Sequence, residues 1–352
     1  MTAELVKKLH EIGVSVDVAV LDNRGQGNDE IFEHVAGHAD AVYRLPCARQ
    51  FDLQTLLALR RRVIDRRIDL VHSHKYKTTF YAALLRPLRR VGLMTTYHNW
   101  ILHTRALRAY ARIDKALARF NDMAVGVSAD VVGQLRGHVL PERLAQVDNG
   151  IDTERFCPAP AGDAGLRASL CADPSQPLIG FVGRLSEEKG LPHLLAALDS
   201  PALAGVQAVI VGDGDQRATL EAELAARGLG ARVRLAGHRR DTVDIDRAVD
   251  LLVLPSLTEA FPMVLLEAMA CGKPVVATRV GEVSRIVDEG RTGRVVAAGD
   301  PAALAAALAA VLAEPGRGLA MGKMARRAVQ EHFSSDAMAR RYLELYGRSL
   351  HG

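Results

Sequence analysis

The stretch DLLVLPSLTEAFPMVLLEAMACGKPVVAT, residues 250–278, contains the pattern that decides the fold. An apolar run at 250–255 is typical of a buried strand, and a β-branched run at 274–278 is typical of a second one. Between the two runs, Pro262 suits the first turn of a helix, and Gly272 suits its end. The stretch therefore predicts a strand–helix–strand unit of a parallel sheet.

Two carboxylates accompany the start of this helix. Glu259 precedes the helix, and Glu267 lies more than one turn inside it, on an otherwise apolar surface where an unpaired carboxylate is costly. The backbone N–H groups of Met263 and Val264 point out of the helix start and form a site for an anion. Because a carboxylate can accept two hydroxyl hydrogen bonds, the pattern fits a sugar ring on either side of a diphosphate.

The same alternation of short β-branched runs and helical stretches extends along the whole chain, which predicts an α/β protein with parallel sheets. A first series of strands is expected at 14–21, 69–74, 93–98, 123–128 and 144–149, and a second at 178–183, 207–212, 232–237, 250–255, 274–278 and 292–298. We therefore expect two domains, 1–155 and 178–333. A Pro-, Gly- and Ala-rich linker at 156–177 joins them, and a final helix at 334–352 is a candidate for packing back on the first domain.

The composition is that of a globular protein. The 352 residues include 49% hydrophobic ones, yet no apolar run approaches the roughly 20 residues of a bilayer span, and the start lacks a signal-peptide core. We therefore expect a cytoplasmic protein. The four cysteines have neither disulfide-framework nor zinc-site spacing.

Positive charge is concentrated in the first domain. Residues 1–150 carry 22 Lys and Arg against 16 Asp and Glu, whereas the remainder carries 23 against 25. Three segments hold most of these cations: 59–67, 86–90 and 103–119. The preferred interpretation of these segments is that they form solvated helix faces, and the alternative is that they make peripheral contact with an anionic membrane surface. Nucleic acid is not expected as a partner, because aromatic residues make up only 5% of the chain.

A loop after the strand at 178–183 carries two further cations. Arg184 and Lys189 stand around a turn at the carboxyl end of that strand, where ligands of open α/β sheets bind. A guanidinium fork and an ammonium suit a diphosphate. A solvated charged turn, with Glu187 and Glu188 as neighbours, is the competing interpretation.

Four segments together resemble a known family. They are GRLSEEKG (183–190), VGDG (211–214), PSLTEAFPMVLLEAMACGKPVVAT (255–278) and DNGIDTERF (148–156). In content and spacing they are similar to the retaining nucleotide-sugar glycosyltransferases of family 4. The resemblance covers almost the whole chain and implies the GT-B fold, in which two Rossmann-like domains face each other across a cleft, with the acceptor on the N-terminal side and the donor on the C-terminal side.

The resemblance also implies roles for individual residues. Glu267 would bind the ribose hydroxyls, and Glu259 would contact the transferred sugar. Arg184 and Lys189 would bind the diphosphate, with the N–H groups of Met263 and Val264 on its distal phosphate. The segment TTYHN, residues 95–99, matches a first-domain histidine of the family, so His98 joins Glu259 as a catalytic candidate, whereas His72 and His74 read as strand-end structure.

For the reaction, the resemblance implies transfer of a hexose from a UDP- or GDP-linked donor to a cell-envelope glycan or a lipid-linked acceptor, with the anomeric configuration retained. The enzyme would need no cofactor or metal ion, since cations and a helix start can neutralise the diphosphate. A GT-B epimerase, or a binding remnant without turnover, is the alternative. Membrane contact, if made, would be at the inner face.

Two features depart from the family pattern. The chain starts inside what would be the first helix. Either the true start lies upstream, or the protein lacks the first strand of the N-terminal domain and its glycine-rich loop, which would leave a strand edge. Ala260 stands where the family commonly has Gly, and a positive φ at that position would be strained for Ala.

Overall fold

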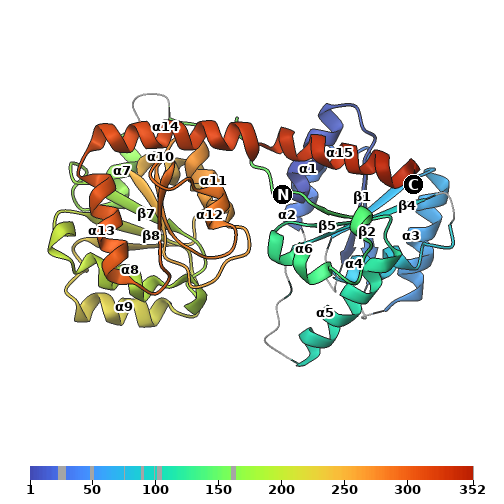
Figure 1. The fold of residues 1–352 in the computed structure, drawn as a ribbon, viewed down its shortest axis with the longest axis horizontal. Coiled ribbons are helices and arrows are strands. Elements are labelled where there is room, and N and C mark those ends of the chain that lie inside the picture. The colour runs from blue at the N-terminus through green and yellow to red at the C-terminus, as the bar shows by residue number, and fades with distance from the viewer. Residues whose placement is uncertain are drawn as a thin grey trace. The chain divides into compact units, whose positions relative to one another are not determined.

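The computed structural model describes residues 1–352 except 23–28, 48–50, 75, 89–90, 99, 101–104, 160–163 and 352 (Figure 1). The chain divides into two compact units. Unit 1 comprises Met1–Gly150 together with Ser335–Gly352, and unit 2 comprises Ile151–Ser334.

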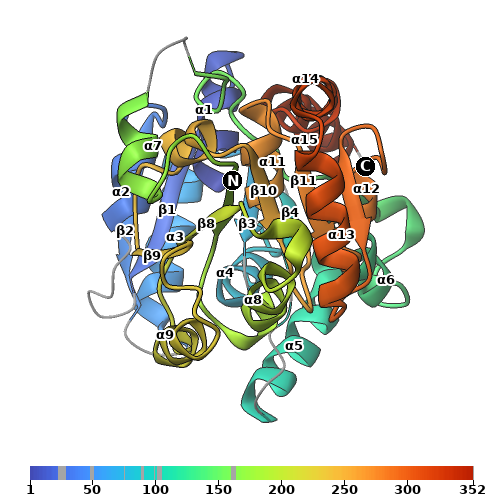
Figure 2. The same ribbon diagram turned by 90° about the vertical axis from the view of Figure 1, so that its left-hand side faces the viewer.

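Unit 2 is built on a six-stranded sheet in which every neighbouring pair is parallel, in the order β12-β11-β10-β7-β8-β9 (Figure 2). Its strands are β7 (Leu178–Val182), β8 (Gln207–Val211), β9 (Val233–Gly237), β10 (Leu251–Leu254), β11 (Val275–Thr278) and β12 (Gly293–Val296). Its α-helices are α7 (Ala164–Leu170), α8 (Leu191–Leu198), α9 (Arg217–Ala226), α10 (Thr242–Ala248), α11 (Met263–Ala270), α12 (Val283–Ile286), α13 (Pro301–Leu312) and α14 (Pro315–His332).

Helices cover both faces of this sheet. Along β7, Ile179 and Phe181 belong to the large apolar cluster that also contains residues of α8, α11, α13 and α14. The alternate residue Leu178 belongs to a second cluster, with residues of α7 and α10. This alternation follows from the two-residue period of a strand, and it explains why the strands are apolar throughout.

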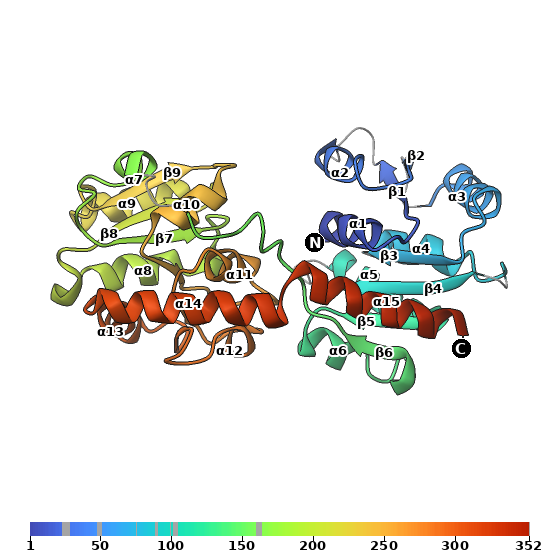
Figure 3. The same cartoon turned by 90° about the horizontal axis from the view of Figure 1, so that it is seen from above.

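Unit 1 contains two separate parallel sheets, β1-β2 and β3-β4-β5-β6 (Figure 3). The strands are β1 (Asp17–Asp22), β2 (Ala41–Pro46), β3 (Leu70–His74), β4 (Gly92–Tyr97), β5 (Met123–Gly126) and β6 (Leu144–Gln146). The helices are α1 (Thr2–Glu11), α2 (Asp29–Val35), α3 (Leu53–Asp65), α4 (Tyr76–Ala83), α5 (Arg105–Leu117), α6 (Ala129–Leu135) and α15 (Ser335–His351).

The break between these two sheets corresponds to the expected strand edge. Within the described residues, β1 pairs only with β2, and β3 pairs only with β4. All six residues of β4 are buried, whereas most residues of β1 and β3 are only partly buried. Among the described residues, β1 and β3 thus each have one edge without a paired strand, and both are less buried than β4.

The last helix of the chain, α15, belongs to unit 1. It contacts α1, β3, β4 and β5. Met338, Tyr342 and Leu345 share a buried cluster with residues of α1, β4 and β5. The C-terminal end therefore completes the core of the N-terminal unit.

The interval 156–177 differs from a simple linker. Its described part contains α7, in which Leu170 is fully buried against the second cluster of unit 2. Since α7 packs on the sheet of unit 2, the interval belongs to that unit, and the units divide between Gly150 and Ile151.

One strand was not expected from the sequence. β2 (Ala41–Pro46) has a short, mixed sequence, AVYRLP, with only one buried apolar residue. Such a strand carries little of the apolar signal on which strand prediction depends.

Among the described residues, no single helix is long and apolar enough to cross a membrane; α13 and α14 meet the length and composition criterion only as a pair bent by 100°.

Candidate functional site

The predicted donor residues follow β7 and β10, two adjacent strands of unit 2, and lie on the loops after these strands and in α11. The loop after β7 contains Arg184 and a short 3-10 helix, Glu187–Lys189. This loop contacts the loop after β10 through the N–H of Leu257, which donates to the carbonyl of Glu188 at 2.8 Å. Gly190 has φ 63°, and a Cβ there would lie 2.2 Å from the carbonyl oxygen of Pro255, so only glycine permits this approach.

Glu259 and Lys189 form an ion pair across these two loops. Lys189 Nζ donates to Glu259 Oε1 at 2.6 Å, and Ser256 Oγ donates to the same oxygen at 2.8 Å. The Lys189 and Glu259 side chains are only 20% and 12% exposed. A charge-assisted hydrogen bond at this depth fixes the carboxylate and keeps the ammonium beside it. Sequence reasoning placed these two residues on different parts of the donor; the structure pairs them directly.

Arg184 has a different setting from Lys189. It is exposed, and among the described residues it takes part in no ion pair. Its guanidinium is therefore available to an anion at the carboxyl end of β7.

The start of α11 presents backbone donors beside this pair. Pro262 is the N-cap, Met263 and Val264 are the first helical residues, and no side chain caps the helix. The first N–H groups of a helix have no partner inside it. Ala260, in the preceding loop, does not have a positive φ, so its methyl group causes no backbone strain there.

Glu267 lies in the middle of α11 and is partly buried. Burial raises the pKa of Glu267, and the positive charge of Arg155 opposes this effect. A carboxyl group in this state gains strongly from hydroxyl donors, because they replace the water that burial has removed.

The sequence analysis did not identify Asp246, a second carboxyl group near Glu267. Asp246, in α10, is 1% exposed, and its Oδ2 has no hydrogen-bond partner among the described residues. Burial, and then the charge of Glu267, raise the pKa of Asp246 well above its usual range. The sequence offers little signal for this residue, because Asp246 is one of several charged residues in and around a short helix, and no local pattern indicates which side chain it faces.

His98, the predicted catalytic histidine, belongs to unit 1, and all the other predicted site residues belong to unit 2. It follows β4 directly, and its Nε2 lies 3.3 Å from Nδ1 of His74 at the end of β3. His72 is bound at both ring nitrogens, by Tyr346 at 2.8 Å and by Thr96 at 2.8 Å. Burial and the nearby His98 lower the pKa of His72 to about 3. His72 is thus a structural residue, while His74 holds the ring of His98.

Within the described parts of the chain, no group of three or more His, Cys, Asp or Glu residues has an arrangement suited to a metal ion. Two surface hollows, of about 450 and 520 Å³, contain none of the predicted site residues. The first lies on α3, and the second is lined mainly by α12, α14 and the turn after α12.

Comparisons with known proteins agree for both units. The family model described as "Glycosyltransferase Family 4" matches residues 1–155, and the family model described as "Glycosyl transferases group 1" matches residues 176–314. The D-inositol 3-phosphate glycosyltransferase of Corynebacterium urealyticum is 33% identical over 310 residues, which are 80% of this chain and 72% of that protein. The alpha-maltose-1-phosphate synthase of Mycobacterium tuberculosis is 33% identical over 316 residues, 79% of this chain and 78% of that protein.

Solved structures show the same fold. Sucrose-phosphate synthase from Thermosynechococcus elongatus has a TM-score of 0.79 at 25% identity, over 98% of this chain and 91% of that one. HepE of Anabaena in complex with UDP has a TM-score of 0.82 at 21% identity, over 98% and 95%. The second likeness concerns the fold alone. Together with the sequence relatives, these structures establish that the chain belongs to glycosyltransferase family 4 and is a hexosyltransferase with the GT-B fold.

Proposed function

We propose that the protein is a retaining glycosyltransferase that moves a hexose from a UDP- or GDP-linked donor to a cell-envelope glycan or a lipid-linked acceptor. The observation that carries the proposal is the Lys189–Glu259 pair, held between two loops beside the free amide end of α11. UDP and UDP-glucose are bound by HepE, which shares the fold, and this supports a UDP-linked donor first.

In this proposal the diphosphate lies between Arg184, Lys189 and the N–H groups of Met263 and Val264. The two cationic side chains and the two backbone N–H groups all offer positive potential to this dianionic group. This chemistry requires no metal ion, so we expect transfer to proceed at an unchanged rate in excess EDTA. The ribose hydroxyls donate to the carboxylate of Glu267.

When the diphosphate takes the ammonium of Lys189, Glu259 becomes available to the hydroxyl groups of the transferred sugar. The acceptor hydroxyl attacks the anomeric carbon from the face that the diphosphate leaves. The bond to the phosphate oxygen breaks, the bond to the acceptor oxygen forms, and the leaving phosphate takes the acceptor proton. The protein stabilises charge and positions the groups, and His98 from unit 1 approaches the donor sugar.

The names of two relatives refer to phosphorylated small molecules: D-inositol 3-phosphate glycosyltransferase, and alpha-maltose-1-phosphate synthase, whose name gives its product. A polar acceptor of similar kind, free or carried on a lipid, is therefore the first to screen. We place the reaction in the cytoplasm, with peripheral contact at the inner face of the membrane when the acceptor is lipid-linked.

Calorimetric titration with UDP and with GDP tests the donor site. We expect one of the two nucleotides to bind and Glu267→Ala to weaken that binding roughly tenfold or more, the loss of about 1.4 kcal/mol that goes with one lost charged hydrogen bond. Glu221→Ala, an exposed glutamate of α9 in the same unit, is the matched control and should leave the affinity unchanged. Binding that Glu267→Ala does not weaken contradicts the assigned ribose contact, and an inverted product anomer contradicts the retaining mechanism.

A further inference from the structure

Helix α3 of unit 1 carries apolar residues on two faces. Its inner face packs Val63, Leu56 and Leu59 into a cluster with Leu85 and Leu93. One such face is enough to hold a surface helix on its sheet. The exposed apolar face beside it therefore needs an explanation of its own.

The outer face of α3 consists of Leu53, Leu57 and Ile64, which are 58%, 54% and 54% exposed. Their spacing, four and then seven residues, puts them in one row along the helix. Phe51, just before the helix, is 45% exposed and extends the apolar surface at its amino end. We call Leu53, Leu57 and Ile64 the outer row.

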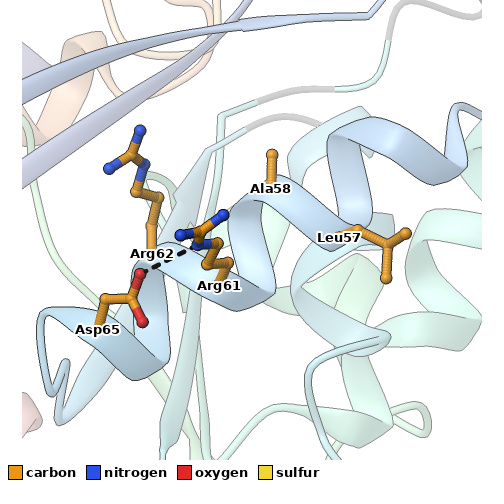
Figure 4. Close-up of a pocket in the computed structure, with 5 residues that line it drawn as sticks. All are labelled: Leu57, Ala58, Arg61, Arg62 and Asp65. Carbon is orange, nitrogen blue, oxygen red and sulfur yellow. Dashed lines mark hydrogen bonds and ion pairs between the residues drawn. The ribbon is translucent and has the colours of Figure 1, made fainter.

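Arginine side chains accompany the outer row. By its spacing, Arg60 lies in the same row, three residues after Leu57 and four before Ile64. Arg61 lies one turn after Leu57 (Figure 4). Leu57 and Arg61 also border the hollow of about 450 Å³, so apolar and cationic groups share one depression (Figure 4). Arg61 pairs with Asp65 at 3.3 Å, whereas Arg60 makes no ion pair among the described residues.

The amino end of α3 lies at the functional edge of unit 1. Thr55 donates a hydrogen bond to the carbonyl of Pro46 at the carboxyl end of β2, and Asp52 caps the helix. The backbone N–H of Asp52 donates to the hydroxyl of Tyr81, in the helix that follows β3. Lys77, at the start of that helix, donates to the carbonyl of Cys47 just after β2 at 3.2 Å, so the carboxyl ends of β2 and β3 lie close together. Because β3 and β4 are parallel, His74 and His98 follow them at this same edge.

We propose that the outer row of α3 is a docking surface for an anionic membrane. An apolar row with cations around it is the arrangement that binds helices in the plane of a bilayer: the leucine and isoleucine side chains enter the acyl boundary, and the arginines contact phosphate groups. The inference deepens the proposed membrane contact by naming its surface, and it rests on that part of the proposed function. It also explains how a lipid-linked acceptor reaches the edge that carries His98.

A second copy of the chain is the other occupant to consider. Two outer rows packed face to face would bring Arg60 and Arg61 of one copy against those of the other, and like charges in an apolar contact are unfavourable. An anionic surface satisfies the same arginines. Charge complementarity therefore favours the membrane.

Co-sedimentation of the 352-residue protein with vesicles tests the proposal. The probes are phosphatidylcholine vesicles and vesicles with 30% phosphatidylglycerol, at about 50 mM and about 500 mM NaCl, conditions between which screening of exposed charges changes strongly. We expect binding only to the anionic vesicles, reduced at high salt. Leu57→Glu/Ile64→Glu should lower the bound fraction at least tenfold, and Arg60→Ala should lower it less. The matched control, Leu319→Glu, changes an equally exposed leucine, 66% exposed, in unit 2 and should bind as the unaltered protein does.

Circular dichroism and UDP titration on the same preparations separate the possible failures. Normal spectra and normal UDP binding with lost sedimentation in Leu57→Glu/Ile64→Glu support the docking surface. No sedimentation of the unaltered protein, or sedimentation that this variant retains, overturns it while leaving the donor site intact. A dimer in sedimentation velocity that the variant dissociates assigns the surface to a second copy instead and also overturns the proposal.

Discussion

At the scale of single residues, Glu259 is the point at which the two donor loops of unit 2 meet. Without a donor, its carboxylate neutralises Lys189 and accepts from Ser256 on the same oxygen. Both side chains are mostly buried, so neither charge can be left alone without a cost in free energy. The pair thus holds the two loops together, and in the proposed mechanism a diphosphate then takes over the ammonium.

Glu259→Gln should separate nucleotide binding from transfer. The amide no longer neutralises Lys189, so we expect UDP to bind somewhat more tightly, by roughly threefold, while the transfer rate falls about 100-fold through loss of a charged contact to the sugar. Calorimetry and a radiolabelled-donor assay measure the two effects. Ser256→Ala, which removes the other donor to the same oxygen, is the control and should have the smaller effect on transfer. Parallel loss of binding and transfer would show that Glu259 acts only on the loops.

Asp246 gives a pH-dependent prediction. Because burial and Glu267 raise the pKa of Asp246, the folded protein keeps this proton at pH values where the unfolded chain, with its ordinary pKa near 3.8, has released it. Over that interval the folded state binds more protons, so the contribution of Asp246 to the free energy of unfolding falls as pH rises.

The Asp246→Asn variant cannot ionise at this position. The difference between its thermal midpoint and that of the unaltered protein should therefore increase in favour of the variant between about pH 5 and about pH 8. The expected change is equivalent to about 1 kcal/mol or more in the free energy of unfolding. Differential scanning calorimetry at the two pH values measures this. Asp215→Asn, at an exposed position, is the control. A difference that does not change with pH would mean that Asp246 is ionised in the fold.

The sequence suggests which residues are candidates for the site, but it says little about which of their side chains contact each other. Glu259, Glu267 and Lys189 were chosen as candidates because each stands at a fixed place relative to a strand end or a helix start. The ion pair between two of them depends on the approach of two loops that are 70 residues apart in sequence. No local pattern contains that approach, and the same is true of the proximity of Asp246 to Glu267.

At the scale of elements, the loop that carries Glu259 is also supported from the strand beyond it. Gly281 follows β11, with φ 49°. A Cβ there would lie 2.3 Å from the carbonyl oxygen of Glu259 and 2.6 Å from that of Ala260. The N–H of Glu282 donates to the carbonyl of Ala260 at 3.1 Å. The turn after β11 thus fixes the backbone on which Glu259 stands.

Gly281→Ala should therefore reduce transfer as well as stability. Gly290→Ala is the matched control, because Gly290 has φ 77° and a Cβ there would meet nothing within 4 Å. Both variants lose about 1–2 kcal/mol from the left-handed backbone, and Gly281→Ala should lose a further ~1–3 kcal/mol through displacement of the loop. Chemical denaturation and the transfer assay measure the two effects. Equal transfer rates in the two variants would show that the Glu259 loop absorbs the extra methyl group.

The elements themselves were largely predictable. Eleven strand positions were expected from apolar runs, and β7 to β12 begin within one residue of those runs. In parallel strands both faces are apolar, which makes the signal strong. β2 was missed because it is an exposed strand of mixed composition, and α7 was read as linker because glycines and prolines surround its short apolar stretch.

At the scale of the whole molecule, the chain visits unit 1 twice. Tyr342 of α15 is 1% exposed, packs among apolar residues of α1, β4 and β5, and shares a hydrogen bond of 2.9 Å with Thr96. A helix of 17 residues at the end of the chain is thus part of the same core as helix α1 at its start.

Tyr342→Ala should destabilise unit 1 and leave unit 2 folded. The loss of a fully buried aromatic side chain costs about 3–5 kcal/mol. Limited proteolysis should then cleave within unit 1 first, while UDP binding, which depends on unit 2, persists. Leu343→Ala, at a 42% exposed position of the same helix, is the control and should resist proteolysis as the unaltered protein does. Loss of UDP binding in Tyr342→Ala would mean that unit 2 does not hold its fold independently.

The chain passes from unit 1 to unit 2 and later returns to unit 1, and this path matters for the design of chimeric proteins. At the boundary, the N–H of Ile151 donates to the carbonyl of Phe333 at 2.9 Å, and Ile151 and Ser334 form a β-bridge, so the entry and exit points of unit 2 are adjacent. Unit 2 is in effect an insertion with neighbouring ends, an arrangement that domain exchange tolerates well. A chimera with a new donor specificity accordingly needs two junctions, at 150/151 and 334/335; a single crossover leaves α15 of one parent on a core shaped by the other.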